Sequence, residues 1–250
     1  MLRVLFQIVL FAALTLDLLH ASPVPAELDR ALKLFRAEGA RGWAFVQTTE
    51  SGGKSLVEHY DPAKPEFSRW TLLKKNGAPP TAPELKEYRE RLSRRTSGDT
   101  APNVKDQLDP ASCELVQADE IRASYRFHLR PGASDDSSAA HMTATFTLNK
   151  PTETIEQVEL NAFEPFSPMF IIKINEAKTT MSYSLPESGR PSLLQRIVVH
   201  IRGRALWFKS LDEDMTVAYS DHEYSFRKPA EPVTENPARP TEPAPANLAP

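Results

Sequence analysis

Two segments in the middle of the chain alternate between apolar and polar residues at every position. In 121–129 the apolar side chains fall on every second residue, and in 142–148 threonines separate the apolar residues. Successive side chains of a β-strand point to opposite faces of a sheet, so this pattern predicts strands with one buried and one solvated face. The polar segment PGASDDSSAA between them predicts a hairpin loop.

Strand-like runs continue on both sides of these two segments. Most are joined by short polar links, which favour antiparallel neighbours because parallel strands need a long crossover. The segment 96–111 is rich in Gly, Asp and Pro and predicts a loop. Further strands are predicted near 43–49, 54–60, 67–74, 154–162, 169–175, 178–185, 193–202, 205–209, 215–219 and 222–227.

Only two segments show helical spacing. Residues 26–38 carry one apolar stripe that Gly39 ends, and residues 82–95 form a highly charged helix with a narrow apolar line. Thr81 and Glu84 match a capping box at the start of the second helix. We therefore expect a mainly β (α+β) fold, in which a large curved antiparallel sheet or half-barrel has an N-terminal helix and a second helix covering its concave side.

The two ends of the chain differ from the middle. Residues 1–21 have a short basic start, an apolar run and small residues, which predicts a signal peptide cleaved as early as 21 or as late as 26 and export to the periplasm. We expect one domain over 22–228 and no transmembrane segment in the mature chain. Residues 229–250 are rich in Pro, Ala and Glu and predict a disordered tail.

Sequence motifs for chemistry are weak. A net charge of −3 gives no reason to expect nucleic acid as a partner. Gly52-Gly53-Lys54-Ser55 has no glycine at position 48 and is followed by a strand, so it predicts a hairpin turn and not a phosphate loop. The histidines lack metal-site spacing, and Cys113 favours a small apolar strand residue over a nucleophile. We therefore expect no enzyme, no metal and no cofactor.

Apolar strand faces outnumber the helices that could cover them. A wide sheet with little helical cover tends to curl, and an apolar concavity suits an acyl chain, a lipid or a lipoprotein. The alternative is that the helices fill the concavity. The candidate ligand-binding residues are Trp43, Phe45, Trp70, Tyr125, Phe127, Met142, Phe146 and Trp207.

A second hypothesis makes the protein an interaction module of the cell envelope. The end of the predicted helix 82–95 is basic, and the tail has Pro-x-x-Pro spacings that suit a partner groove. In this hypothesis the core is filled, and the helix and the tail bind an envelope protein. The candidate partner-binding residues are Arg89, Arg91, Arg94 and Arg95.

One arrangement of motifs resembles an uncharacterised family of bacterial periplasmic proteins. It consists of a W-x-F strand, a Y-D-P turn, an R-W-x-L-L strand, an N-G turn and a charged helix. The architecture is similar to that of the lipoprotein-localisation (LolA/LolB-like) half-barrels, and this resemblance implies a curved sheet, a helical lid and an apolar cavity for acyl chains. The matching residues are Trp43, Phe45, Tyr60, Asp61, Pro62, Arg69, Trp70, Leu72, Leu73, Asn76, Gly77, Pro80, Thr81, Glu84 and Tyr88.

Overall fold

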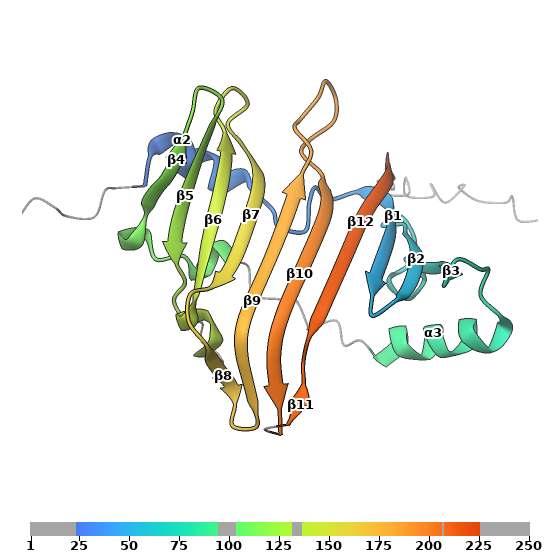
Figure 1. Ribbon diagram of the computed structural model, residues 1–250. Helices are drawn as coiled ribbons and strands as arrows, with labels where there is room; N and C mark the ends of the chain where they lie inside the picture. Colours follow the sequence, from blue (N-terminus) through green and yellow to red (C-terminus); the bar gives the residue numbers. More distant parts are fainter. Residues whose placement is uncertain (1–23, 95–103, 132–136, 207, 226–250) are drawn as a thin grey trace, which may run out of the picture.

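The structure is a computed structural model that describes residues 24–94, 104–131, 137–206 and 208–225. The predicted signal peptide and the predicted tail therefore lie outside the described residues. The fold is mainly β, with one large open antiparallel sheet and an N-terminal helix, as the sequence predicts. Figure 1 shows the long strands side by side, with helices α2 and α3 toward opposite ends of the sheet.

The described part of the chain forms two α-helices and twelve strands. Short 3-10 helices occupy Glu66–Ser68, Val104–Gln107, Pro110–Ser112 and Ser137–His141. The α-helices are α2 (Ala26–Leu34) and α3 (Ala82–Arg94). The strands are β1 (Trp43–Ser51), β2 (Lys54–Tyr60), β3 (Trp70–Lys75), β4 (Glu114–Ala118), β5 (Arg122–His128), β6 (Met142–Asn149), β7 (Thr154–Ala162), β8 (Phe166–Met169), β9 (Ile172–Tyr183), β10 (Leu194–Ala205), β11 (Lys209–Ser210) and β12 (Glu213–Tyr224).

The order of strands across the sheet is β3-β2-β1-β12-β10-β9-β7-β6-β5-β4. Strands β4 to β12 follow one another as an antiparallel meander, and β8 and β11 pair only with β9 and β10. The N-terminal hairpin β1–β2 joins this meander through β12, with Gln47 opposite Tyr219. The first strand and the last strand of the described chain thus lie side by side within the sheet.

In three places, two consecutive strands that the sequence predicts separately form one continuous strand. The break predicted between 169–175 and 178–185 is an irregularity at Asn175-Glu176 inside β9, and the break predicted between 193–202 and 205–209 is the matching position, Arg202-Gly203, inside β10. The break predicted before 222 is also wrong, because Asp221 takes a positive φ of 51° within β12 and the strand continues. These positions are β-bulges, which use the same residue types as turns.

Both helices pack on the same face of the sheet, which we call the helix face. The ring of Phe35, at the end of α2, makes edge contacts with Phe146 on β6 and Tyr183 on β9, at 5.9 and 5.2 Å between centroids. In α3, Tyr88 is buried and donates a hydrogen bond of 2.8 Å to Glu58 on β2. Glu58 lies opposite Gln47 and shares its face with Tyr219, which packs against the core.

The main core lies under α2. Leu28 and Ala31 supply the buried side of the helix, and Phe127 and Phe146 meet them from the sheet with almost no exposed surface. Polar contacts also hold the helix at its middle and at its C-terminal end. Arg30 makes two hydrogen bonds to Glu153 in the β6–β7 turn, and Lys105 donates to the carbonyls of Leu32 and Phe35. Helix α2 is therefore a fixed cover for one half of the helix face.

Candidate functional site

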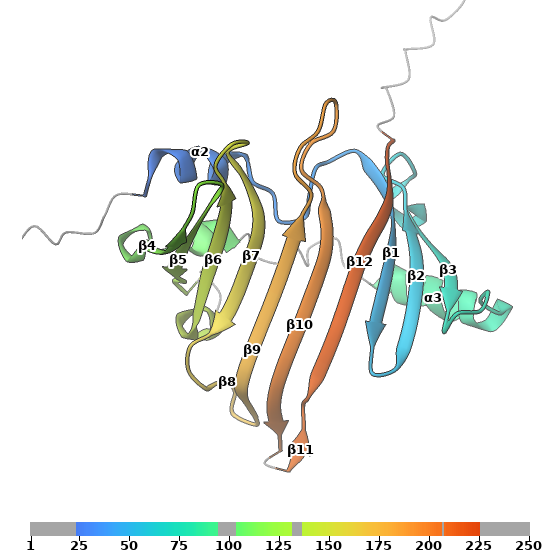
Figure 2. The same ribbon diagram turned by 45° about the horizontal axis from the view of Figure 1, so that its top comes forward.

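The helix face has a hollow at the C-terminal end of α2, which we call the α2 hollow. Its volume is about 330 Å³. Figure 2 shows this end of the molecule, where the connection from α2 to β1 passes the β9–β10 loop. The lining residues are Ala31, Leu34, Phe35, Arg36, Gly39, Ala40, Arg41, Glu153, Thr154, Ile155, Tyr183, Pro186, Pro191 and Ser192.

The hollow exists because α2 ends early. The sequence predicts a helix to residue 38, but the backbone leaves the helical conformation at Phe35, where ψ is 138°. Gly39 has a φ of +83°, a conformation that suits glycine, and its N–H donates to the carbonyl of Arg36. The hydroxyl of Tyr183 donates to the carbonyl of Ala37 at 2.9 Å. The chain from Arg36 to Arg41 is thus held as a rim beside the sheet.

The floor of the hollow is apolar. Phe35, Ile155 and Ala31 are buried, and Tyr183 shows only 6% of its surface. Burial raises the pKa of the Tyr183 hydroxyl well above its ordinary value, so this group is a neutral hydrogen-bond donor. Such a floor attracts hydrocarbon and offers no group for acid–base chemistry at neutral pH.

The charged residues of the lining are Arg36, Arg41 and Glu153, and Glu38, between the two arginines in the rim segment, helps to raise the pKa of Tyr183. The carboxylate of Glu153 is bonded to Arg30, and this pairing lowers its pKa. Among the described residues, no ion pair joins Arg36 or Arg41 to an acidic side chain. Guanidinium groups match carboxylate and phosphate oxygens in geometry and charge. The rim can therefore hold an anionic group beside an apolar floor.

The predicted ligand-binding residues are not brought together at one place. Tyr125, Phe127 and Phe146 are buried in the core under α2, with Met142 at its border. Trp207 lies outside the described residues, and none of the other seven lines the α2 hollow. The interlocked rings under α2 show that the helix fills this part of the helix face, as the alternative considered in the sequence analysis expects.

Phe45 and Trp70 belong to a second aromatic cluster, near α3. The ring of Phe45 lies 5.0 Å from that of Tyr60 and 5.3 Å from that of Tyr219, between centroids. Burial raises the pKa of Tyr219 to about 12. Trp43 makes a separate contact with Tyr224. This cluster fills the helix face near β1 and β2, and the sequence identified two of its members.

A second hollow lies at the opposite end of the helix face, and we call it the tip-side hollow. It is open and has a volume of about 660 Å³. Ile172, Ile174, Ile201 and Leu211 supply apolar surface, and its border is acidic at Asp212, Glu213 and Asp214. An anionic head group would be repelled there, so the two hollows suit different molecules.

Charged groups on the outer face form ion pairs that hold the sheet together. Asp214 on β12 accepts from Arg202 and His200 on β10, and Arg202 is the largest cause of its lowered pKa. Asp214 is exposed to solvent, while His200 and Arg202 are partly exposed. In the part of the chain that the structure describes, no three metal-ligating side chains gather. This arrangement links neighbouring strands, and His200 and Asp214 also line an open hollow of about 660 Å³ on the outer face.

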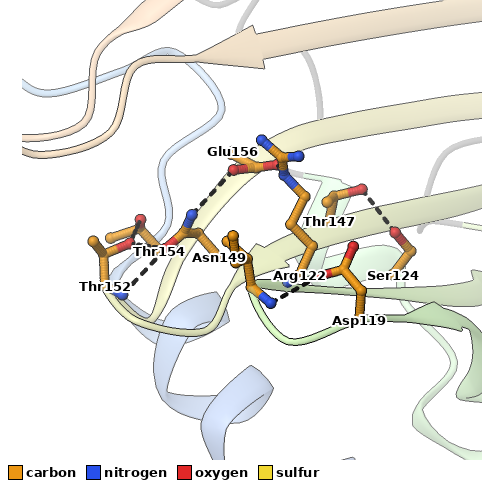
Figure 3. Close-up of polar contacts among 9 residues, drawn as sticks. Asp119, Arg122, Ser124, Thr147, Asn149, Thr152, Thr154 and Glu156 are labelled. Carbon is orange, nitrogen blue, oxygen red and sulfur yellow. Dashed lines mark hydrogen bonds and ion pairs between the residues drawn. The ribbon is translucent and has the colours of Figure 1, made fainter.

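Figure 3 shows a second polar group, at the turns between β4 and β7. Asn149 accepts from Thr152 and donates to Glu156, and Glu156 also pairs with Arg122. Ser124 and Thr147 share a hydrogen bond across β5 and β6. These contacts hold the β6–β7 turn and link β5 to β6 and to β7, so the group fixes the arrangement of these strands.

Three of the four predicted partner-binding arginines, Arg89, Arg91 and Arg94, belong to α3. Arg89 and Arg91 are exposed, and the guanidinium of Arg91 lies over the ring of Tyr88. Arg94 ends the helix, while its side chain and the whole of Arg95 are outside the described residues. Cys113 is half-buried, and burial raises the pKa of its thiol, which disfavours the reactive thiolate.

The hollows are built from residues that sequence reasoning did not select. The α2–β1 connection and the β9–β10 loop carry Gly39, Pro186 and Pro191, which mark turns but give no sign that the turns meet. Within the described residues, no helix combines the length and hydropathy that crossing a bilayer requires. No protein-family model, no curated protein and no solved structure matches the chain.

Proposed function

We propose that this protein is a non-enzymatic binder of an acyl chain with an anionic head group, and that the chain lies in the α2 hollow. One observation carries the proposal: an apolar floor lies beside two arginines, Arg36 and Arg41, in a hollow of about 330 Å³. This volume falls within the range of small-molecule sites. The export signal predicted at 1–21 would make the protein a periplasmic carrier or sensor, in agreement with the half-barrel resemblance.

Physical chemistry gives each part of the hollow a role. Each CH₂ group that leaves water contributes about 0.8 kcal/mol, so even a short acyl segment against Phe35 and Ile155 gains several kcal/mol before ordering costs. Arg36 and Arg41 supply positive charge at the rim of the hollow. A hydrocarbon without an anionic head group would lack this attraction to the arginines. An anion without an acyl chain would lack the apolar contacts with the floor of the hollow.

The proposal is tested by filling the hollow. Ser192 lines it from the β9–β10 loop, while Ser188 lies in the same loop outside the lining and is exposed. Ser192→Trp is expected to weaken binding of a fluorescent fatty acid at least tenfold, because the indole occupies the space of the chain. Ser188→Trp introduces the same residue and is expected to bind like the parent protein. Titration followed by fluorescence gives both affinities.

The head-group contact is tested with charge variants. Arg36→Gln/Arg41→Gln is expected to weaken fatty-acid binding about tenfold while leaving binding of the corresponding fatty alcohol unchanged, since the alcohol has no charge. Arg89→Gln/Arg91→Gln on α3 removes the same charge elsewhere and serves as control. Equal fatty-acid affinity in all three proteins, or a Ser192→Trp variant that binds normally, would refute the proposal.

A further inference from the structure

The end of the sheet farthest from the α2 hollow carries a group of exposed apolar side chains, which we call the apolar tip. It is formed by the turns β8–β9 and β10–β11, which extend beyond the other strands in both views (Figures 1 and 2). The N–H of Leu206 donates to the carbonyl of Ile171 at 2.8 Å, so the two turns are joined. The described residues of the tip are Met169, Phe170, Ile171, Leu206 and Phe208.

The tip places large apolar side chains directly in water. Phe170 is 87% exposed and Phe208 is 84% exposed. Single exposed apolar residues are common on proteins, and Phe67, at 78%, is one on this molecule. Five such residues on two joined turns are a concentrated patch, and exposed apolar patches mark binding surfaces.

Basic residues surround the tip just behind the apolar side chains. Lys173 lies opposite Arg204 across β9 and β10, and Lys209 lies opposite Ala205. Because side chains alternate along a strand, Lys173 and Arg204 project from the outer face and Lys209 from the helix face. No acidic residue occurs in 167–175 or 203–211, but Glu176 and Asp212 follow directly behind these two segments, and Asp212 lines a hollow together with Arg204 and Phe208. We call Lys173, Arg204 and Lys209 the basic collar.

The fold itself does not explain why the three residues of the basic collar lie together. Like charges directly opposite each other destabilise a sheet, and Lys173 and Arg204 are such a pair. Within the described residues, no ion pair joins either of them to an acidic side chain. A negatively charged surface that binds at the end of the sheet would explain why Lys173 and Arg204 lie opposite each other.

We propose that the apolar tip inserts into the interface of an anionic lipid bilayer, with the basic collar at the level of the head groups. Aromatic and aliphatic side chains enter the border of the acyl region, while lysine and arginine are attracted to anionic lipids. A protein groove fits the tip less well, because protein interface cores are depleted in lysine and the tip projects as a narrow end. The hydrogen bond from Leu206 to Ile171 keeps the two turns joined.

The test is sedimentation of the full chain with lipid vesicles. The parent protein is expected to bind vesicles of phosphatidylcholine mixed with phosphatidylglycerol and to bind pure phosphatidylcholine vesicles far more weakly. Phe170→Ser/Phe208→Ser is expected to lower binding to the anionic vesicles at least tenfold. Phe67→Ser removes an equally exposed ring elsewhere and is expected to leave binding unchanged. Circular dichroism checks that each variant is folded.

Charge is tested separately from apolar surface. Each basic residue near an anionic surface contributes about fivefold in binding, so Lys173→Gln/Arg204→Gln/Lys209→Gln is expected to lose on the order of a hundredfold. Lys74→Gln/Lys86→Gln/Arg89→Gln lowers the net charge equally and is expected to lose much less. The Ser192→Trp variant should bind vesicles normally, so this proposal and the acyl-chain proposal can fail independently.

Three results would overturn the membrane proposal. The first is equal binding to neutral and anionic vesicles, and the second is equal loss in the tip variants and their controls. The third is concentration-dependent self-association that Phe170→Ser/Phe208→Ser abolishes together with an absence of vesicle binding. That last result would assign the tip to a second copy of the chain.

Discussion

Phe35 connects the core to the α2 hollow. Its ring is wedged against Phe146 and Tyr183, and the helix ends at its backbone. Helical spacing in the sequence correctly predicts that Phe35 faces the core. The spacing does not predict the end of the helix, because the contact with Tyr183 and the hydrogen bonds from Lys105 involve residues far along the chain. Tertiary contacts therefore decide where α2 stops.

Glu84 is a residue whose role the sequence predicts. The N–H and hydroxyl of Thr81 donate to its carboxylate at 2.9 and 2.8 Å, and Lys75 pairs with it at 3.1 Å. The hydrogen bonds from Thr81 are the largest cause that lowers the pKa of Glu84, to about 2. Because the folded-state pKa is below the ordinary value, the stabilisation is full above that value and is lost as the pH falls toward 2.

Glu84→Ala is therefore expected to lower the melting temperature at neutral pH, with a difference from the parent protein that shrinks as the pH falls through this window. Glu87→Ala removes an exposed carboxylate one turn along the same helix and should show no such dependence. Thermal unfolding followed by circular dichroism across the pH range measures both variants. A deficit of constant size at every pH would show that the ionised carboxylate of Glu84 is not what stabilises α3.

At the scale of elements, β9 and β10 form the long centre of the sheet. Sequence reasoning divided each of them into two strands, because Asn175-Glu176 and Arg202-Gly203 look like turns. The structure uses Gly203 for a close approach between the strands. A Cβ atom there would lie 2.6 Å from the backbone oxygen of Lys173 and 3.2 Å from Ile174. Turns and bulges use the same residues, and only the partner strand distinguishes them.

Gly203→Ala is expected to destabilise the protein by about 1–3 kcal/mol, because the added methyl group meets backbone that cannot move aside easily. Trimming the nearby side chain in Gly203→Ala/Ile174→Val should not restore stability, since the closest atom belongs to the backbone. Urea unfolding gives the free energies. A Gly203→Ala protein as stable as its parent would show that the strands separate freely at the bulge, against the arrangement described here.

An element follows from the sequence when its local pattern is regular. Strands β5 and β6 alternate without interruption, so their limits and buried faces follow from the sequence. The short strand β8 was not predicted, because its four residues include Pro168 and show no alternation. The pairing of β1 with β12 joins segments at opposite ends of the chain, and no local pattern encodes it.

At the scale of the whole molecule, the two α-helices of the described residues cover only parts of one face of their twelve-stranded sheet. Composition and alternation predict this shortage of cover. They do not predict where surface stays open, because aromatic residues such as Phe127 and Phe146 fill the region under α2 completely. The α2 hollow arises at the meeting of three distant segments, around Arg36, Ile155 and Ser192, and this meeting depends on the strand order.

The central claim is that an acyl chain occupies the α2 hollow. The most direct measurement is a set of intermolecular nuclear Overhauser effects between dodecanoate and the methyl groups of the full chain. Binding in the α2 hollow predicts contacts from the hydrocarbon chain to the methyl groups of Ala31, Leu34 and Ile155. Contacts confined to Ile172 and Ile174 in the tip-side hollow, or no contacts from a saturating ligand, would contradict it.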